Sequence, residues 1–337
     1  MAISVGLIGA GRIGALHGRN MVATAGVDLV GIADALPETA GALGFELNAP
    51  VCSAEQMIAD PAIDAIVICS STDTHADLIE AAACAGKAIF CEKPVDLSSD
   101  RIRSCLKIVE TAGVPLMIGF NRRFDPHFSA LRTRLRDGDI GEVEFLSIVG
   151  RDPMPPPLSY VKRSGGLFRD MMIHDFDMAR FLLGEEFVEV HAVGSALIDP
   201  EIGQAGDVDT AAVMLKTASG KICQISNSRR STYGYDQRVE VLGSRGMLQV
   251  QNLPESAILH AGAAGIQHGR HVEFFLERYA DAYERELRHF FDCIRDSLPP
   301  SPTGNDGLRA QIIADAATQA AQTGHPQHLA EEAATGI

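Results

Sequence analysis

Residues 3–34 read ISVGLIGAGRIGALHGRNMVATAGVDLVGIAD, and their pattern is the clearest indication of the fold class. Two short apolar runs, at 3–8 and 27–33, flank a segment with helical periodicity at 12–24. That order predicts a βαβ unit, in which two parallel strands are joined by a helix. The glycine-rich turn GAGRIG, at 9–14, lies between the first strand and the helix.

Apolar runs and helical patterns keep alternating as far as residue 120. Further strands are expected at 64–70, 88–92 and 115–120, with helices at 75–86 and 98–112. Because parallel strands need crossover connections, this repetition predicts a parallel sheet with helices on both faces.

The pattern changes after Asn121. Helical segments are expected at 125–136 and about 166–183, on either side of a proline-rich loop at 152–160. The other segments are short strands between turn signals, at 143–150, 188–197, 209–217, 221–228, 236–243 and 246–252. They predict a second α/β domain built on a large, mostly antiparallel open sheet. Two closing helices are expected at 272–297 and 305–323, and the tail from Gly324 is expected to be loosely ordered.

The composition argues against several classes of function. The formal net charge of -15 disfavours nucleic acid as a partner, since such proteins need basic surfaces. No apolar run approaches the roughly 20 residues of a membrane-spanning helix, so no membrane partner is expected. The 7 cysteines form no CxxC pair and their number is odd, which indicates thiols in a reducing compartment. No export signal is visible, and we therefore expect a cytoplasmic protein.

The glycines of GAGRIG suit a dinucleotide in this context. Gly9 permits the tight turn, Gly11 lets the backbone approach a pyrophosphate, and Gly14 allows close packing of helix and strand. The helix that follows, with Arg12 and Ile13 in its first turn, presents its positive end to the phosphates. An ordinary glycine turn is the alternative interpretation.

Asp34 lies 20 positions after Gly14, at the end of the second apolar run. A carboxylate there can accept hydrogen bonds from the adenosine ribose, which predicts NAD as the cofactor. The 2'-phosphate of NADP would meet like charge from Asp34, although Arg12 would partly compensate, so use of NADP stays open. The alternative is an aspartate in a surface turn.

Oxidation of an alcohol requires a base for the hydroxyl proton, and histidine titrates in the right range. In GGLFRDMMIHDFDMARFLLG (165–184), a helix would place Asp170, His174 and Asp177 on one polar stripe. His174 is then the candidate base, with Asp170 contacting substrate or orienting the imidazole. A purely structural pair one helical turn apart is the alternative. No recognised metal-ligand spacing includes these residues, so no metal is expected.

Lys93 follows the strand expected at 88–92, at the edge where ligands of open α/β sheets bind. Its ammonium could hydrogen-bond the substrate hydroxyl and stabilise the developing alkoxide. A lysine on the surface at a strand end is the alternative.

Two tyrosine-containing loops are further candidates. The prolines of RDPMPPPLSY (151–160) could form a stiff wall with Asp152 and Tyr160 pointing inward, or a loop that contacts another domain or subunit. For Tyr233 and Tyr235 of SRRSTYGYDQR, burial with one satisfied hydroxyl is the default interpretation.

Several motifs together resemble the Gfo/Idh/MocA oxidoreductases over essentially the whole chain. GLIGAGRIGALH, STDTHADLIEAA, CEKPVDLS and GFNRRFDPHF are similar to that family's cofactor domain, and SGGLFRDMMIHDFDMARFLLGE to its catalytic helix. NRRFDP, RDPMPPPLSYVKRSGG and SRRSTYGYDQRVEVLG are similar to the inositol 2-dehydrogenase branch. The resemblance implies an NAD-binding Rossmann domain with a doubly wound parallel sheet at 1–120. It also implies a substrate-binding and oligomerisation domain at 121–300, and a C-terminal helix and tail at 301–337 that pack back on the first domain.

The resemblance also implies an activity, the NAD-dependent oxidation of myo-inositol to 2-keto-myo-inositol, and a dimer or tetramer formed through the open sheet. Lys93, Asp170 and His174 match the catalytic residues, with a cis-proline expected after Lys93. The implied cofactor contacts are Gly9, Gly11, Arg12, Ile13, Gly14, Asp34, Thr72, His75, Glu92 and Lys93. The implied polyol contacts are Arg122, Arg123, Asp152, Asp170, His174 and Tyr235.

Other functions stay open at this point. Family members that act on another inositol isomer or on a sugar share these motifs. An NAD-dependent glycosidase would use the cofactor only transiently and release sugar without net NADH. A non-catalytic nucleotide sensor would need only the glycine turn, and the presence of Lys93, Asp170 and His174 argues against it.

Overall fold

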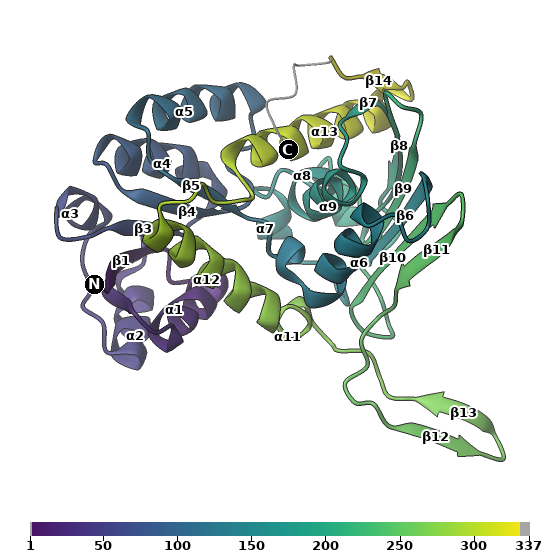
Figure 1. The fold of residues 1–337 in the computed structure, drawn as a ribbon, viewed down its shortest axis with the longest axis horizontal. Coiled ribbons are helices and arrows are strands. Elements are labelled where there is room, and N and C mark those ends of the chain that lie inside the picture. The colour runs from purple at the N-terminus through teal and green to yellow at the C-terminus, as the bar shows by residue number, and fades with distance from the viewer. Residues whose placement is uncertain (1, 331–337) are drawn as a thin grey trace. The chain divides into compact units, whose positions relative to one another are not determined.

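The computed structural model describes residues 2–330 and divides the chain into two compact units. Unit 1 contains the residues up to 124 together with 281–311, and unit 2 contains 125–280 and the residues from 312 onward. Unit 1 is therefore discontinuous in sequence. In Figure 1 the yellow-green helix α12 (Ala280–Asp296) accompanies the purple N-terminal segments of this unit.

The sheet of unit 1 has five parallel strands in the order β2-β1-β3-β4-β5. Their bounds are Ile3–Ile8 for β1, Val27–Ala33 for β2, Ala65–Ile68 for β3, Ala88–Glu92 for β4 and Leu116–Gly119 for β5. Every residue of β3, β4 and β5 is buried, as their nearly continuous apolar sequences require in a sheet covered on both faces. The predicted parallel sheet is confirmed.

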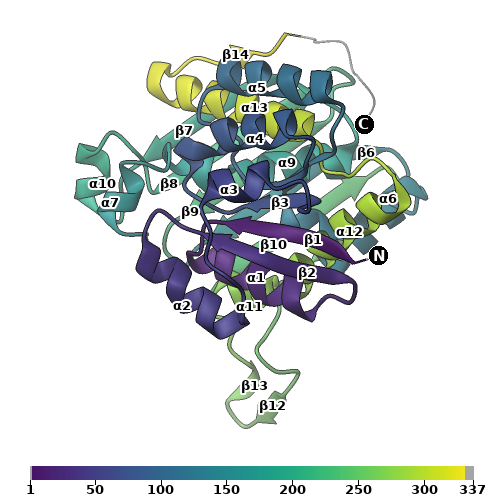
Figure 2. The same ribbon diagram turned by 90° about the vertical axis from the view of Figure 1, so that its left-hand side faces the viewer.

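Helices cover both faces of this sheet, as Figure 2 shows for α4 and α5 on one side and α1 and α2 on the other. Their bounds are Arg12–Ala23 for α1, Pro37–Leu47 for α2, Ala54–Ala59 for α3, His75–Cys84 for α4 and Ser99–Ala112 for α5. Two short 3₁₀ helices, η1 (Thr72–Thr74) and η2 (Asn121–Phe124), complete this part of the chain. The pattern of apolar residues predicted neither α2 nor α3, although Ser53 and Gln56 form a capping box at the start of α3.

Helix α12 completes the hydrophobic core of unit 1. It supplies Leu287, Phe290 and Phe291, all fully buried, and the Phe290 ring meets Phe90 of β4 edge-on with centroids 5.8 Å apart. Helix α13 (Gly304–Thr323) begins in unit 1, where Gln311 donates a hydrogen bond to the Leu97 carbonyl oxygen. The contiguous domain boundaries expected at 120 and 300 differ from this division because α12 packs with the N-terminal strands.

Unit 2 is built on a seven-stranded sheet in the order β11-β10-β6-β9-β8-β7-β14. The bounds are Val143–Arg151 for β6, Phe187–Ser195 for β7, Thr210–Thr217 for β8, Ile222–Ser228 for β9, Asp236–Gly243 for β10, Gly246–Val250 for β11 and Gln327–His328 for β14. The pair β6 and β9 is parallel and the other neighbours are antiparallel, so the predicted mostly antiparallel sheet is confirmed. The expected loose tail is wrong at β14, which pairs with β7 as an edge strand, and residues 331–337 lie outside the described part.

The helices of unit 2 are α6 (Pro126–Arg136), α7 (Leu158–Val161), α8 (Leu167–Asp170), α9 (Ile173–Leu183), α10 (Pro200–Gln204) and α11 (Phe275–Arg278). The single helical stretch expected at 166–183 is in fact two helices, α8 and α9, separated by a turn at Met171 and Met172. Strands β12 (Leu259–Gly262) and β13 (Gly265–His268) form an exposed hairpin that extends away from the sheet of this unit (Figure 1) and that the sequence did not predict.

Among residues 2–330, no helix has both the length and the apolar character needed to cross a membrane.

Candidate active site

The three glycines of the turn between β1 and α1 differ in their surroundings. Gly9 has a φ of +98°, and a Cβ there would lie 2.4 Å from the backbone carbon of Cys69. A Cβ on Gly14 would lie 1.8 Å from the Gly9 carbonyl oxygen, whereas one on Gly11 would meet nothing within 4 Å. Gly9 and Gly14 are therefore required by the backbone, and Gly11 leaves open space next to the turn.

Helix α1 presents its N-terminus at this open space. Gly11 is the N-cap residue and offers no side chain to the first turn, which also contains no acidic residue. The N–H groups and positive dipole end of a 12-residue helix thus face outward beside exposed Arg12, while Ile13 is half-buried. This arrangement fits the pyrophosphate of a dinucleotide.

Asp34, directly after β2, is tied to the glycine turn. One of its carboxylate oxygens accepts a hydrogen bond from the Ala10 N–H at 2.7 Å, and the other accepts one from the Leu36 N–H at 2.9 Å. A carboxylate has about four acceptor sites, so each oxygen can still accept a ribose hydroxyl. The half-buried side chain is thus fixed beside Gly9 to Gly14, as the ribose role requires.

Lys93 directly follows β4, and the Lys93–Pro94 peptide bond is cis, as the resemblance implied. The turn is held by His75, whose Nδ1 lies 2.8 Å from the Pro94 carbonyl oxygen and whose Nε2 lies 3.0 Å from that of Ser70. Burial lowers the pKa of His75, and a neutral imidazole can donate to only one of these two carbonyls at a time. His75 therefore links the lysine-bearing turn to the end of β3.

Glu92 supports the same turn from inside the protein. Its Oε1 is 2.8 Å from Nε2 of fully buried His17, and its Oε2 accepts the backbone N–H of Lys93 at 3.3 Å. Glu92 and His75 were predicted to contact cofactor, yet they are only 8% and 2% exposed. Both form hydrogen bonds with backbone groups of the turn at Lys93 and Pro94, whereas Thr72 on η1 is half-buried.

Glu286 joins His17 and Glu92 in a group whose ligand-type atoms lie within 4.8 Å of one another. The His17 ring also meets Phe90 and Tyr283 edge-on. The hydrogen bond between His17 and Glu92 accounts for their proximity, and we assign no metal to this group.

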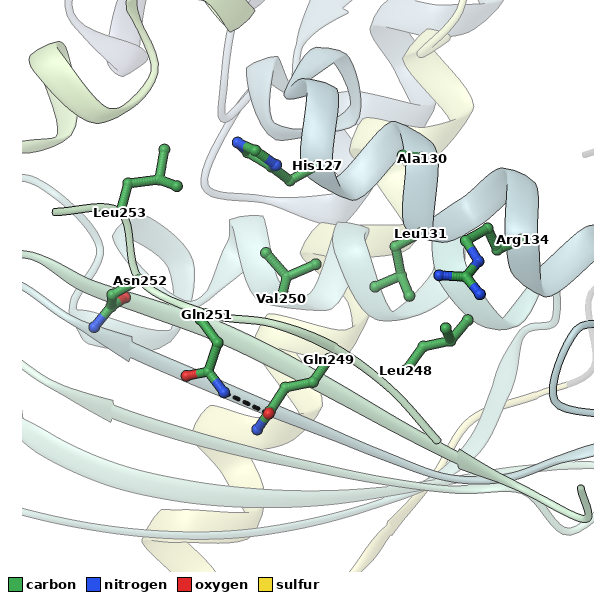
Figure 3. Close-up of a pocket in the computed structure, with 10 residues that line it drawn as sticks. All are labelled: His127, Ala130, Leu131, Arg134, Leu248, Gln249, Val250, Gln251, Asn252 and Leu253. Carbon is green, nitrogen blue, oxygen red and sulfur yellow. Dashed lines mark hydrogen bonds between the residues drawn. The ribbon is translucent and has the colours of Figure 1, made fainter. Parts of the chain in front are cut away.

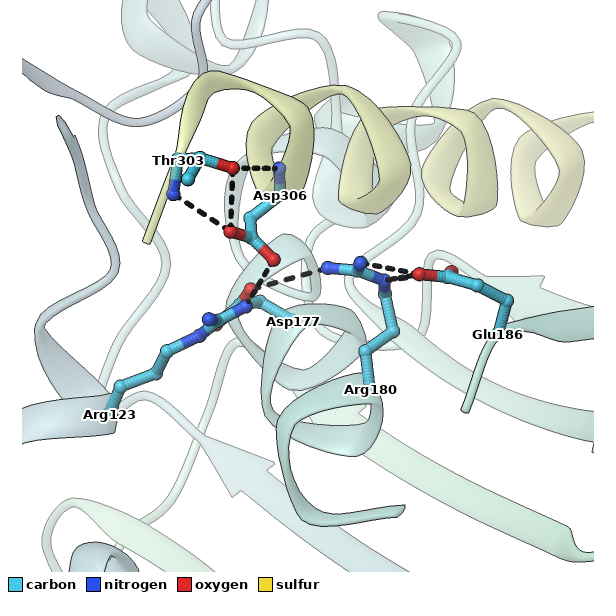
Figure 4. Close-up of polar contacts among 6 residues, drawn as sticks. All are labelled: Arg123, Asp177, Arg180, Glu186, Thr303 and Asp306. Atoms are coloured by element: carbon cyan, nitrogen blue, oxygen red, sulfur yellow. Dashed lines mark hydrogen bonds and ion pairs between the residues drawn. The ribbon is translucent and has the colours of Figure 1, made fainter. Parts of the chain in front are cut away.

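Arg122 and Arg123, the predicted polyol contacts of unit 1, lie on η2. Arg122 is 5% exposed. Arg123 donates through Nη2 to Asp306 at 2.9 Å, and the second carboxylate oxygen of Asp306 accepts the Thr303 N–H at 2.8 Å (Figure 4). Part of the Arg123 guanidinium is thus engaged at the start of α13.

In unit 2, His174 stands out by its exposure. It is half-buried, whereas every other residue from Met171 to Arg180 is buried. Asp170 ends α8, and its Oδ1 accepts a hydrogen bond from the Tyr160 hydroxyl at 2.8 Å. Desolvation, followed by the charge of Asp170, raises the pKa of Tyr160, so its phenol stays protonated as a donor.

The other polar residues of α9 point into the core and do not form the polar stripe that the spacing suggested. Asp175 is fully buried, where it accepts hydrogen bonds from the side-chain amides of Asn227 at 2.9 Å and Gln237 at 3.0 Å. Asp177 is 1% exposed and lies 3.8 Å from Arg180, which in turn donates to Glu186 (Figure 4). These contacts fasten α9 to β9 and β10, leaving His174 as its accessible polar group.

Asp152 and Tyr235 occupy different environments. Asp152 is half-buried after β6, and its N–H donates to the Ser228 carbonyl oxygen at 3.0 Å. Tyr235 is 4% exposed, and its ring meets Tyr279 edge-on with centroids 6.0 Å apart. Sequence reasoning missed three buried polar residues, because such residues carry no periodic signal. Arg229 faces Asp170, and Asn227 and Gln237 donate hydrogen bonds to Asp175 of α9.

Unit 2 also contains two cavities. The first, about 350 Å³, runs between α6 and β11, where His127, Leu131 and Val250 are among the side chains that line it (Figure 3). The second, about 320 Å³, is lined by polar groups that include Asp236 and His271. Neither includes Asp170 or His174.

Comparison with known proteins identifies the family. Residues 3–120 match the model of an oxidoreductase family with an NAD-binding Rossmann fold, and residues 128–249 match the GFO/IDH/MocA C-terminal domain. The chain belongs to the Gfo/Idh/MocA oxidoreductase family. It is an oxidoreductase with an NAD-binding Rossmann domain, as the resemblance implied.

Relatives within this family narrow the comparison. The chain is 52% identical over 319 residues to an inositol 2-dehydrogenase of Rhizobium meliloti (strain 1021), with 95% of this chain and 97% of that protein covered. A myo-inositol dehydrogenase structure from Corynebacterium glutamicum ATCC 13032 has a TM-score of 0.94 and 41% identity, covering 98% of this chain and 100% of that one. A scyllo-inositol dehydrogenase structure from Lactobacillus casei with bound NAD(H) and scyllo-inositol has a TM-score of 0.91 and 28% identity, covering 97% and 99%.

Proposed function

We propose that this Gfo/Idh/MocA enzyme oxidises myo-inositol to 2-keto-myo-inositol with NAD as the hydride acceptor. The observation that carries the proposal is the exposure of His174. This histidine is half-buried on the otherwise mostly buried helix α9, four positions after Asp170. It occurs in a chain 52% identical to an inositol 2-dehydrogenase.

His174 is the proposed base. Its Nδ1 is enclosed by protein, so Nε2 is the ring nitrogen that we assign to substrate. The imidazole accepts the proton of the hydroxyl as the carbon–oxygen bond becomes a carbonyl, a role that histidine commonly has in enzymes. Asp170, which is held by the Tyr160 hydroxyl, accepts a hydrogen bond from a substrate hydroxyl and thereby orients the ring of the polyol.

Lys93 is the proposed electrophilic group. Its ammonium hydrogen-bonds the oxygen that loses the proton and stabilises the negative charge that develops there. NAD, when bound, accepts the hydride from the same carbon. The residues proposed to bind it are those of the glycine turn (Gly9, Gly11, Arg12, Ile13, Gly14), Asp34 and Thr72, with His75 and Glu92 supporting the turn of Lys93.

NAD is the proposed cofactor rather than NADP because of Asp34. Its carboxylate is fixed at the turn by two backbone N–H groups, where a 2'-phosphate would meet its negative charge. Neighbouring Arg12 offsets part of this repulsion, so we expect a preference rather than strict exclusion.

The polyol contacts and the isomer are proposals of the same kind. Asp152, Arg122, Arg123 and Tyr235 are the proposed further substrate contacts, with Asp152 favoured because it is half-buried after β6. The preference for the myo isomer rests on the 41% identity to the myo-inositol dehydrogenase from Corynebacterium glutamicum given above.

We also propose a homo-oligomer, a dimer or tetramer, formed through the open sheet of unit 2. Val193 and Met214 on neighbouring strands are 68% and 52% exposed, as is suitable for an interface. All 7 cysteines are free thiols, which suits the reducing cytoplasm that we propose as the location.

The test is a panel of myo-, scyllo- and chiro-inositol and glucose, each with NAD and with NADP, followed by absorbance of the reduced cofactor. We expect the largest kcat/KM for myo-inositol with NAD. A lack of reduced cofactor across the panel would refute the dehydrogenase. In a separate assay with nitrophenyl glycosides, release of sugar without net NADH would identify a glycosidase instead.

A further inference from the structure

Arg229 is the largest fully buried side chain among the described residues, at 1% exposure. It directly follows β9, and its backbone N–H donates to the Asp209 carbonyl oxygen at 2.8 Å. A guanidinium is permanently charged and rarely buried without partners, so its position needs a physical reason.

Two carboxylates lie on either side of this guanidinium. Nη1 is 3.5 Å from Oδ2 of Asp170, and Nη2 is 3.7 Å from Oδ2 of Asp207. Both distances are longer than a strong hydrogen bond, and neither Nε nor Nη2 has a hydrogen-bond partner among the described residues. The attraction is therefore mainly between charges, and hydrogen-bonding capacity remains unused.

Asp207 is fastened to the beginning of the helix that Asp170 ends. Its Oδ1 accepts the N–H of Leu167, the first residue of α8, at 2.9 Å. A Cβ on Gly166 would lie 2.7 Å from the same oxygen, so the close approach of Asp207 depends on glycine there. Arg229 thus lies between an anchored carboxylate and Asp170.

Asp170 consequently has a different partner at each oxygen. Oδ1 accepts the Tyr160 hydroxyl at 2.8 Å, and Oδ2 faces Arg229. The charged and titratable groups of this arrangement come from separate elements: Tyr160 lies on α7 and Arg229 follows β9, while Asp207, which faces the other Nη of Arg229, follows α10. Arg229 is the positive charge that this arrangement places against Asp170.

We propose that Arg229 is a positioning residue, which holds the Asp170 carboxylate in the orientation that meets the substrate. The inference rests on the proposed function, in which Asp170 orients the polyol. A contribution to folding alone is a poor reason for the residue, since well-packed apolar side chains commonly replace buried ion pairs without loss of stability. Arg229 itself, at 1% exposure, is out of reach of solvent.

The test is a double-mutant cycle that combines Arg229→Met with Asp170→Asn in the full-length enzyme. With Asp170 present, Arg229→Met is expected to lower kcat/KM for myo-inositol about 10²-fold, because a reacting group loses its alignment. In the Asp170→Asn background the same change is expected to lower it less than about 3-fold, since the group that Arg229 positions is gone. Equal losses in both backgrounds would overturn the proposal.

A pH profile separates this role from a structural one. Removal of the neighbouring cation makes a carboxylate easier to protonate, so the acidic limb of kcat/KM should move to higher pH in Arg229→Met. Arg229→Lys, which keeps the charge, should leave the limb in place, and Arg229→Gln carries the same cycle if the methionine variant does not fold. An unmoved limb in a folded Arg229→Met variant would contradict the proposal.

Arg278→Met is the matched control. Arg278 is also buried in unit 2, at 5% exposure, and its ion pair with Asp125 does not involve Asp170. We expect a lower melting temperature and an unmoved acidic limb. The activity of the wild-type enzyme is the separate test of the proposed function, and a lack of NADH formation with every inositol refutes that function. If the wild type is active and Arg229→Met lowers kcat/KM equally in both backgrounds, only the role of Arg229 is refuted.

Discussion

His174 differs from its neighbours on α9 in one physical respect, its exposure. The residues around it on α9 are buried, including three charged ones that pair within the core of unit 2. Asp175 on the same turn is held by Asn227 and Gln237, so the backbone that carries His174 has little freedom. A substitution at His174 should therefore affect chemistry more than folding.

We predict that His174→Ala lowers kcat by about 10²–10⁴-fold while the affinity for NAD is retained, because general acid–base groups contribute on this scale. Steady-state kinetics and NAD titration by fluorescence measure the two effects. His191→Ala is the control, since His191 is an exposed histidine of the same unit that pairs with Glu189. A loss below 10-fold at His174 would remove it from the role of base.

A second prediction concerns cofactor choice. Asp34→Asn should shift the ratio of kcat/KM for NAD over NADP toward NADP, because the neutral amide no longer repels a 2'-phosphate. The amide oxygen can still accept one of the two backbone N–H groups that Asp34 now accepts. Asp64→Asn is a matched control, since Asp64 also accepts a backbone N–H, from Ser4. An unchanged ratio would take Asp34 out of the ribose site.

At this scale the sequence predicted residues whose role depends on local spacing and missed those defined by burial. Gly9, Gly14 and Asp34 follow from a turn between strand and helix, and the structure places them together. Arg229 gave no such signal, because an arginine between Ser228 and Arg230 is indistinguishable by pattern from one on the surface. Its burial arises from contacts with residues 59 and 22 positions away, Asp170 and Asp207.

The turn before α1 provides a prediction at the scale of the element. Gly11→Ala should fold with an unchanged melting temperature and a raised KM for NAD, because its Cβ enters open space beside the turn. Gly14→Ala should destabilise unit 1, because its Cβ would lie 1.8 Å from the Gly9 carbonyl oxygen. Thermal unfolding with and without NAD distinguishes them. Equal destabilisation by both would contradict the assigned geometry.

The loop between β7 and α10 provides a second prediction for a single element, because its backbone N–H groups bind Asp209. Burial opposes ionisation of Asp209, but hydrogen bonds from the N–H groups of Asp199, Leu197 and Ile198 outweigh it and lower the pKa of Asp209. A lowered folded-state pKa contributes stability above the unfolded value of about 3.9, and this contribution disappears as pH falls through the folded value.

Asp209→Asn should therefore reduce the free energy of unfolding by about 1–3 kcal/mol at pH 7. The difference from wild type should narrow below about pH 4, where the wild-type carboxyl also becomes protonated. Urea denaturation at both pH values measures this, with exposed Asp137→Asn as the control. A constant difference across the range would contradict the electrostatic explanation.

Among the helices and strands, the sequence predicted the long periodic segments correctly. It did not predict which face of a helix is buried where polar residues enter the core. The helices α4 and α5 and all five strands of unit 1 match their expected positions closely, because their apolar patterns are continuous. The stripe predicted from Asp170, His174 and Asp177 is one case, because Asp177 of helix α9 is buried beside Arg180, and Asp175 of the same helix is buried too. The partners of Asp175, Asn227 and Gln237, lie on β9 and β10, more than 50 positions away, and a local pattern does not show them.

At the scale of the molecule, unit 1 depends on a segment far away in sequence. We predict that Phe290→Ala on α12 reduces the free energy of unfolding by about 3–5 kcal/mol, because it leaves a cavity beneath the sheet. Hydrogen exchange should locate the loss of protection in strands β1 to β5. Phe45→Ala is the control, since Phe45 is 92% exposed. Protection lost only in unit 2 would contradict the assignment of α12 to unit 1.

Because α12 lies far along the chain, the ribosome synthesises it long after the strands against which it packs. When the ribosome has made the first 124 residues, the five-stranded sheet still lacks Leu287, Phe290 and Phe291, which lie beyond the 156 residues of 125–280. At about 5–20 residues per second, that interval lasts on the order of 10–30 s. The apolar face that α12 later covers is exposed on the nascent chain throughout, so a chaperone that shields such surface has its natural client in the half-made cofactor domain.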